Sequence, residues 1–231
     1  MIKIITIDRE YGSGAADIAR TLAARLGWKL WDELLTSEIA RITGCDCPAV
    51  QEREERCDAL HYRLFRAFMR GSFEGTVNAH RVKMVDADCI REAAEKVVRE
   101  AAGQGNCVIV GRGSAYYLQS SPEAFHVFVY APFEDKIHRL RSKGKSEEEA
   151  QVLAETVDQD RAAYIKLYFK VEWPSRAIYD LMINSSLGDE VVAETILNSV
   201  AAIENHSPAG RETHEPGQRK QAVSGLFGSR R

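Results

Sequence analysis

The chain opens with an apolar strand that runs directly into a turn with two glycines and then into a helix. Residues 2–8 form a continuous run rich in β-branched residues, which predicts a central parallel strand buried on both faces. Gly12 and Gly14 follow, and apolar residues then recur at helical spacing from Ala15 until Gly27 stops the pattern. Glycine adopts positive φ without strain and leaves room for a ligand beside the main chain. This order of elements predicts a cradle of backbone N–H groups for an anion such as phosphate, with a plain tight turn as the alternative.

The rest of the chain alternates strands and helices, which is typical of a doubly wound α/β fold with a parallel sheet. Further strands are expected at 28–32, 107–110, 126–130 and 181–184. Helices are expected at 15–26, 33–43, 87–102, 131–142, from Ser146 onward, and at 190–203. The strand at 107–110 ends in Gly111-Arg112-Gly113, at the edge of the sheet where ligands of open α/β sheets collect.

Two segments depart from this alternation. Residues 46–82 are rich in charge and carry no strand pattern, so we expect a helical insertion. Its Arg63, Arg66 and Arg70 recur at helical spacing, either as a solvated surface or as a basic binding face. Residues 206–231 are poor in apolar residues and contain Pro and Gly, which predicts a disordered basic tail behind one domain at 1–205.

Composition limits the kinds of partner. The chain has 231 residues and a formal net charge of -3, which argues against bulk binding to nucleic acid. It contains no apolar run near the roughly 20 residues that a membrane-spanning helix needs. Because it begins with a strand and not a signal peptide, we expect a cytoplasmic protein whose partner is a small molecule.

The five cysteines are odd in number and show no C-x-x-C spacing, so we interpret them as reduced thiols. Cys45, Cys47 and Cys57 with His61 are the alternative, as a zinc site. A spacing of one residue between two ligands is poor for tetrahedral coordination from a single turn, and we predict no metal site built from these side chains.

Five stretches of the chain, taken in order, resemble the cytidylate-kinase-like family of phosphate-loop proteins. They are R-E-Y-G-S-G at 9–14, V-I-V-G-R-G at 108–113, V-Y-A-P-F-E at 129–134, D-Q-D-R-A-A-Y at 158–164 and W-P-S-R-A-I-Y-D-L-M-I-N-S at 173–185. The resemblance covers roughly residues 1–203. It implies a three-layer α/β/α fold with a five-stranded parallel sheet, a helical acceptor-side insertion at 46–82 and a helical lid at 139–170. It also implies transfer of the γ-phosphoryl group of ATP, with Mg²⁺, to CMP, dCMP or a similar small acceptor.

The resemblance assigns roles to particular residues. Gly12, Ser13 and Gly14 would wrap the donor phosphates, with Ala15, Ala16 and Asp17 opening the helix behind them. Arg112 would grip the phosphate of the acceptor, and Asp32, after the second strand, would face the same substrate. The residues expected at the lid and its flanking helix are Lys136, Arg139, Asp158 and Arg161. Asp158 and Arg161 are also spaced for an ordinary ion pair within one helix.

The loop departs from the phosphate-loop consensus G-x-x-x-x-G-K-[ST]. Ala15 stands where lysine would be, and Asp17 stands where a hydroxyl that touches Mg²⁺ would be. Arg9, at the other end of the loop, is the candidate substitute that would reach over the β- or γ-phosphate. Two alternatives to a kinase follow from the missing lysine: a catalytically silent nucleotide sensor, and an interaction protein that keeps the fold. The resemblance also leaves room for a homodimer.

Overall fold

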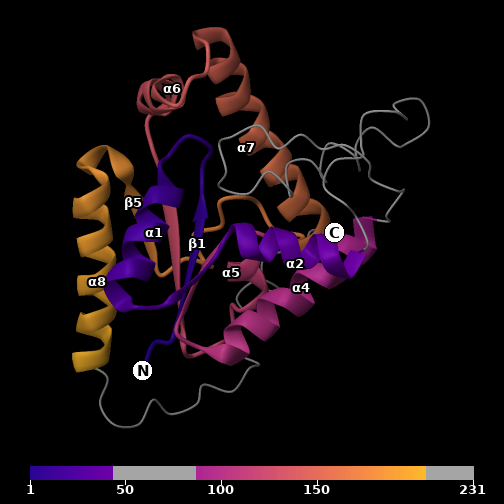
Figure 1. Ribbon diagram of the computed structural model, residues 1–231, viewed down its shortest axis with the longest axis vertical. Coiled ribbons are helices and arrows are strands. Elements are labelled where there is room, and N and C mark those ends of the chain that lie inside the picture. Colours follow the sequence, from indigo (N-terminus) through magenta and orange to yellow (C-terminus); the bar gives the residue numbers. More distant parts are fainter. Residues whose placement is uncertain (44–86, 207–231) are drawn as a thin grey trace, which may run out of the picture.

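The computed structural model describes residues 1–43 and 87–206, which form one five-stranded parallel sheet between layers of helices (Figure 1). The strand order is β2-β3-β1-β4-β5. The strands are β1 (Ile4–Arg9), β2 (Lys29–Trp31), β3 (Cys107–Val110), β4 (Ala124–Tyr130) and β5 (Leu181–Asn184). The predicted α/β class and parallel sheet are therefore confirmed.

Helices cover both faces of the sheet. In Figure 1, α1 and α8 lie on one side of the sheet and α2, α4 and α5 on the other, while α6 and α7 extend beyond its upper end. Their bounds are α1 (Ala15–Leu26), α2 (Glu33–Thr43), α4 (Ala87–Gln104), α5 (Ser114–Tyr117), α6 (Phe133–Ser142), α7 (Glu147–Phe169) and α8 (Asp189–His206). None of the helices in the described ranges is long and apolar enough to cross a membrane.

Strand β1 occupies the centre because its side chains are apolar on both faces. Ile5 and Ile7 pack with α1 and α8 in one core, whereas Ile4 packs with α2 and α4 in the other. All three are at most 3% exposed. Ile7 pairs with Val110 of β3 on one side and Arg9 pairs with Val129 of β4 on the other, so residues at the carboxyl end of β1 lie between two neighbouring strand ends.

A third, smaller core joins α6 and α7 to the glycine turn, which we define as residues 10–14. Tyr11 of the turn is buried against Ile137 and Leu140 of α6 and against Ala150 and Val157 of α7. The turn is therefore held from the outside by the helix pair as well as by the sheet.

The expected elements agree closely with the observed ones. Helices α1 and α2 and strands β3 and β5 have the predicted bounds, and α7 begins after Ser146, whose hydroxyl accepts a hydrogen bond from the Glu149 N–H as an N-cap. Helix α4 continues through Gly103 to Gln104, and the short helix α5 had no periodic signal to predict it. The insertion predicted at 46–82, with its arginines and the cysteines proposed for zinc, lies outside the described residues, as does the tail after His206.

Gly27 and Gly103 test the backbone reasoning as a matched pair. Neither would place a new Cβ within 4 Å of another atom, but Gly27 has φ +64° whereas Gly103 is helical. Gly27→Ala should reduce the free energy of unfolding by about 1 kcal/mol because of left-handed strain. Gly103→Ala should raise it by about 0.5 kcal/mol through helix propensity. Urea denaturation measures both, and shifts of the same sign would contradict the assignment.

Candidate functional site

The glycine turn offers backbone N–H groups to an anion. Gly12 and Gly14 have φ of 79° and 78°, so both adopt the left-handed conformation expected of them. Hydrogen bonds within the protein engage the N–H groups of Glu10, Tyr11, Ser13, Asp17 and Ile18. Within residues 1–43 and 87–206, no partner accepts from the N–H groups of Gly12, Gly14, Ala15 and Ala16. Four N–H donors at a helix N-terminus suit a phosphate group.

Helix α6 packs so tightly against this turn that side chains at positions 12 and 14 would collide with it. A Cβ on Gly12 would lie 3.1 Å from the Lys136 Cβ and 3.2 Å from the Lys136 carbonyl oxygen. A Cβ on Gly14 would overlap the Arg139 guanidinium. The two glycines therefore serve the contact with α6 as well as the conformation of the turn.

Three basic side chains from one side of α6 lie near the turn and the start of α1. They are Lys136 and Arg139 of the helix and its C-cap residue Lys143. Arg139 forms an ion pair with Asp189 at 2.8 Å and donates to the Ser185 carbonyl at 3.1 Å. Lys143 lies 3.2 Å from Asp17 at the start of α1. Burial alone would raise the pKa of Asp17, but hydrogen bonds from Arg20 and Lys143 hold the pKa below its ordinary value.

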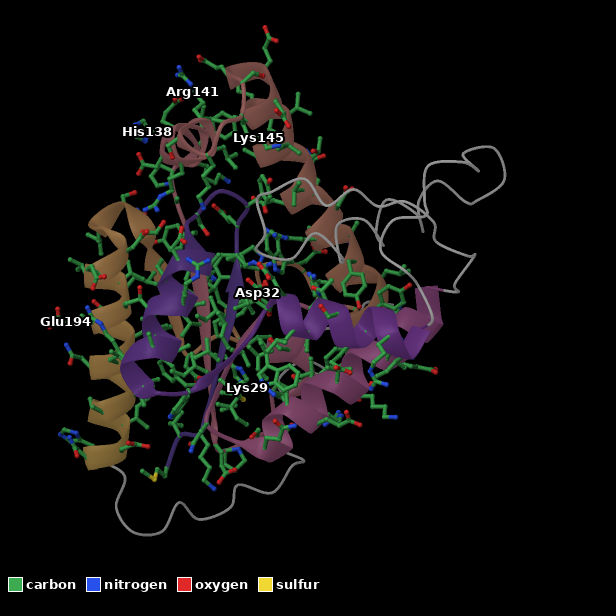
Figure 2. All side chains as sticks on the ribbon, viewed as in Figure 1. Lys29, Asp32, His138, Arg141, Lys145 and Glu194 are labelled. Atoms are coloured by element: carbon green, nitrogen blue, oxygen red, sulfur yellow. The ribbon has the colours of Figure 1, made fainter. Side chains whose placement is uncertain are left out.

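Lys143 was not among the predicted site residues. Its spacing of seven from Lys136 and four from Arg139 places all three on one helical face, which is a signal that the sequence contained. Figure 2 shows two further side chains of α6, His138 and Arg141, projecting outward from the helix.

A buried ion-pair cluster connects the turn to α6 and α7. The Lys136 Nζ lies 3.2 Å from Glu10 Oε2 and 3.3 Å from Asp158 Oδ2. Asp158 Oδ1 accepts from the Tyr11 N–H at 2.8 Å and from Arg161 at 3.1 Å. Burial raises the pKa of Asp158, with Arg161 and Lys136 opposing that rise. Asp158 and Arg161 thus form the intrahelical pair that their spacing suggests, and Asp158 also binds the turn.

Three arginines line one pocket at the carboxyl edge of the sheet. Its lining residues in the described part of the chain are Asp8, Arg9, Arg112, Gly113, Arg161, Tyr164, Ile165 and Trp173. The Arg9 guanidinium lies directly against the Cα of Gly111, where a Cβ would overlap it. Its Nε and Nη2 atoms are buried, and no described group accepts a hydrogen bond from either. Burial, and then the charge of Arg161, lower the pKa of Arg9 to about 10.

Arg112 occupies a strained backbone conformation between two glycines. Its φ is 56°, and the flanking Gly111 and Gly113 have φ of 66° and 69°. A non-glycine residue is disfavoured there by about 1–2 kcal/mol, and such strain is typical of functional positions. The Arg112 Nη2 donates to the Thr36 hydroxyl at 2.6 Å. Burial, and then the charge of Arg9, lower the pKa of Arg112 to about 9.

Asp8 lines the same pocket and binds the side chains of Trp173 and Tyr179. The sequence did not predict this role for Asp8. Asp8 Oδ2 accepts from the Trp173 indole at 3.0 Å and from the Tyr179 hydroxyl at 2.6 Å, and Oδ1 accepts from the Arg9 N–H at 3.0 Å. Burial, and then the charge of Asp8, raise the pKa of Tyr179, which therefore stays a hydroxyl donor. No local pattern marks these partners, because Trp173 and Tyr179 lie 165 and 171 residues from Asp8.

The structure sorts the predicted site residues into two groups. Lys136 and Arg139 contact the turn that begins α1, whereas Arg9 and Arg161 lie with Arg112 in the arginine pocket. Asp32 belongs to the second group, because its charge opposes the lowering of the pKa of both Arg9 and Arg112 that burial causes. Figure 2 shows Asp32 at the end of β2 toward α6 and α7, with Lys29 at the opposite end. The Arg9 guanidinium also lies at this edge of the sheet, against Gly111, the residue that follows β3.

A parallel sheet of this strand order, a glycine turn before α1 and helices on both faces define the fold class of phosphate-loop kinases. The chain belongs to the cytidylate kinase-like family, which matches residues 4–187.

Two solved structures share this fold at low sequence identity. An uncharacterised protein from Eubacterium ventriosum is 21% identical, with a TM-score of 0.62 over 87% of this chain and 99% of that one. Shikimate kinase from Acinetobacter baumannii, in complex with shikimate, is 18% identical, with a TM-score of 0.50 over 90% of this chain and 97% of that one. No curated protein is significantly similar to the chain in sequence.

Asp158 is expected to be the most sensitive residue of the ion-pair cluster. Asp158→Ala removes the acceptor of the Tyr11 N–H and leaves Lys136 and Arg161 short of a partner, so it should lower the free energy of unfolding by about 2–4 kcal/mol. Asp158→Asn should lose less, because its amide oxygen still accepts from Tyr11. Glu155→Ala, at an exposed position of the same helix, is the control and should stay within about 0.5 kcal/mol. Equal losses at 158 and 155 in chemical denaturation would refute the role of the cluster.

Proposed function

We propose that the protein is an ATP-dependent phosphotransferase that passes the γ-phosphoryl group of ATP to CMP, dCMP or a similar small acceptor. The observation that carries this proposal is that the glycine turn, with its unpaired N–H groups, follows directly after Arg9, which lines the arginine pocket. The free N–H groups of the glycine turn suit a donor phosphate, and the arginine pocket suits a second anion. Membership of the cytidylate kinase-like family supports the same reaction class.

On the donor side, helix α6 would supply the positive charge that the loop lacks. The Ala15 side chain carries no positive charge that could bind a phosphate. Lys136 and Arg139 contact the turn from outside, and Lys143 contacts Asp17 at the start of α1. Phosphoryl transfer depends on positioning and on neutralising negative charge that spreads over the transferred group. A cation from a neighbouring helix meets that need as well as a cation from the loop itself.

On the acceptor side, Arg112 would bind the acceptor with its planar guanidinium, which fits a phosphate in a bidentate way. Arg161 connects the two sites, because it donates to the Arg9 carbonyl at 2.9 Å and to Asp158, which in turn holds the Tyr11 N–H. We therefore propose that Arg161 binds the acceptor on the side of its pocket that faces the transferred group.

The backbone N–H groups at the start of α1 suit phosphate, whereas Asp17, the acidic side chain there, fits a metal ion less well. Asp17 has the oxygen atoms that Mg²⁺ prefers, but they already accept from Arg20 and Lys143. Bound together with the nucleotide, Mg²⁺ would neutralise part of the phosphate charge.

A silent nucleotide sensor is the second candidate. It is favoured by Ala15, which replaces the catalytic lysine, and by the ion pairs that occupy Asp17. Such a protein would bind ATP or CMP and release no ADP. Turnover measured beside binding separates the two candidates.

A coupled ADP-release assay tests the proposal over a panel of nucleoside monophosphates, with shikimate as a hydroxyl acceptor for comparison. Arg139→Ala should lower kcat/KM for ATP by roughly 10–100-fold, because a charge-assisted contact to phosphate is lost. Arg141→Ala, on the outer face of the same helix, is the matched control and should stay within about twofold because its ion pair with Glu147 is exposed.

The outcomes are distinct. Calorimetric binding of Mg-ATP without ADP release from any acceptor would favour the sensor. Absence of heat with Mg-ATP at millimolar concentration would end the kinase, and absence of heat with CMP as well would end the sensor. Equal effects of the two arginine substitutions would remove α6 from the donor site.

A further inference from the structure

We infer that Arg9 is a binding residue of the acceptor, and that Arg9, Arg112 and Arg161 together form a site for a dianionic phosphoryl group carried by that acceptor. The inference rests on the proposed function and deepens it, because it moves Arg9 away from the donor phosphates and names the charge of the second substrate. Arg9 would then select the acceptor instead of replacing the loop lysine.

The Arg9 side chain points into the arginine pocket and not toward the glycine turn. Arg9 lines the pocket together with Arg112 and Arg161, whereas no residue from Gly12 to Asp17 lines it. Its guanidinium rests on Gly111, at the end of β3, so the side chain crosses from β1 toward the strand end that precedes Arg112. A Cβ at position 111 would occupy the space that the guanidinium fills. Glycine at 111 is therefore explained by Arg9.

The charged neighbours of Arg9 also belong to the arginine pocket and its surroundings. The charges that act most on it belong to Arg161, Asp32, Asp8 and Asp158. Asp8 and Arg161 line the pocket with it, and Asp32 also acts on Arg112. Arg139, the basic residue that touches Gly14, is instead engaged by Asp189 and by the Ser185 carbonyl. Two sets of cations thus serve two separate places.

The unpaired donors indicate what the pocket binds. Three guanidinium groups and one carboxylate, Asp8, stand among its described lining residues, while Asp158 pairs with Arg161 and Asp32 acts on Arg9 and Arg112 from outside the lining. The Asp8 oxygens are held by Trp173, Tyr179 and the Arg9 backbone N–H. Two buried nitrogens of Arg9 have no acceptor in the described ranges. Buried donors without an acceptor are unfavourable, so a bound anion would relieve this arrangement.

A dianionic phosphate monoester meets these requirements better than a carboxylate or a neutral alcohol. Its oxygens can accept from several guanidinium groups at once, including the Arg9 nitrogens that have no acceptor in the described ranges. An acceptor without that group would leave the Arg9 nitrogens unpaired, and sites built from polar groups reject such analogues strongly.

The test compares two arginine substitutions that remove the same atoms. Inorganic phosphate, sulfate and acetate serve as probes at constant ionic strength, with binding followed by thermal unfolding and by tryptophan fluorescence. Arg9→Met should weaken binding of phosphate and sulfate by about tenfold or more, corresponding to about 1.4 kcal/mol, and should leave the Kd of Mg-ADP within about twofold. Arg139→Met should do the reverse. Acetate should protect neither variant nor the wild type.

Two further readouts separate binding from folding. Without any anion, Arg9→Met should unfold at a higher temperature than the wild type, because removal of one buried cation relieves repulsion from Arg112 and Arg161. Arg9→Lys, which keeps the charge but loses the fork, should retain part of the phosphate response. Trp173 lines the pocket, so Trp173→Phe should abolish the fluorescence change that phosphate causes there and so distinguish the pocket from the glycine turn.

The inference is overturned if Arg9→Met weakens Mg-ADP while phosphate and sulfate still protect the pocket. It is also overturned if Arg9→Met loses stability without any anion and Arg9→Lys restores none of the phosphate response. Failure of every variant to bind Mg-ADP would instead defeat the proposed kinase. The phosphate titration would still decide the role of Arg9 in that case.

Discussion

The carboxylate of Asp158 joins the parts on which the site depends. It is buried where the glycine turn, α6 and α7 meet, and it accepts from Tyr11, Lys136 and Arg161. Arg161 in turn donates to the carbonyl of Arg9, the last residue of β1. Desolvation opposes this arrangement, as the raised pKa of Asp158 indicates, so the interaction persists because several partners share one carboxylate. The turn and both helices are thereby held as one unit.

Each of the two proposed anion sites combines strain or unpaired polar groups with a rigid surrounding. Four N–H groups of the glycine turn and the start of α1 have no protein partner in the described ranges, and Arg112 holds a left-handed backbone between two glycines. Such features lower stability in the absence of a ligand, and the apolar cores on both faces of the sheet offset the loss. The small core around Tyr11 adds a local anchor beside the turn. Preorganised sites of this kind bind anions without much rearrangement.

The sequence predicted well wherever the determinant was local. The strand, glycine turn and helix at the start of the chain follow from neighbouring residues, and α1 has the expected bounds. The side-chain direction of Arg9 could not be predicted in the same way, because it depends on Gly111, which follows the neighbouring strand β3. The bonds from Trp173 and Tyr179 to Asp8 likewise need the finished sheet. Helix α5 has only four residues, too few to show a period. Lys143 could have been predicted from the sequence, because helical spacing places it on the same face as Lys136.

The backbone of Arg112 makes this position informative beyond the single protein. At φ of 56°, glycine would be more comfortable than arginine, so the main chain alone favours replacement. Only the guanidinium gives a reason to keep arginine there. If Arg112 binds an anion as proposed, relatives with the same strand and flanking glycines that have lost the ligand would be free to drift to glycine at this one position. The residue found there would then distinguish family members that retain a ligand from members that have kept only the scaffold.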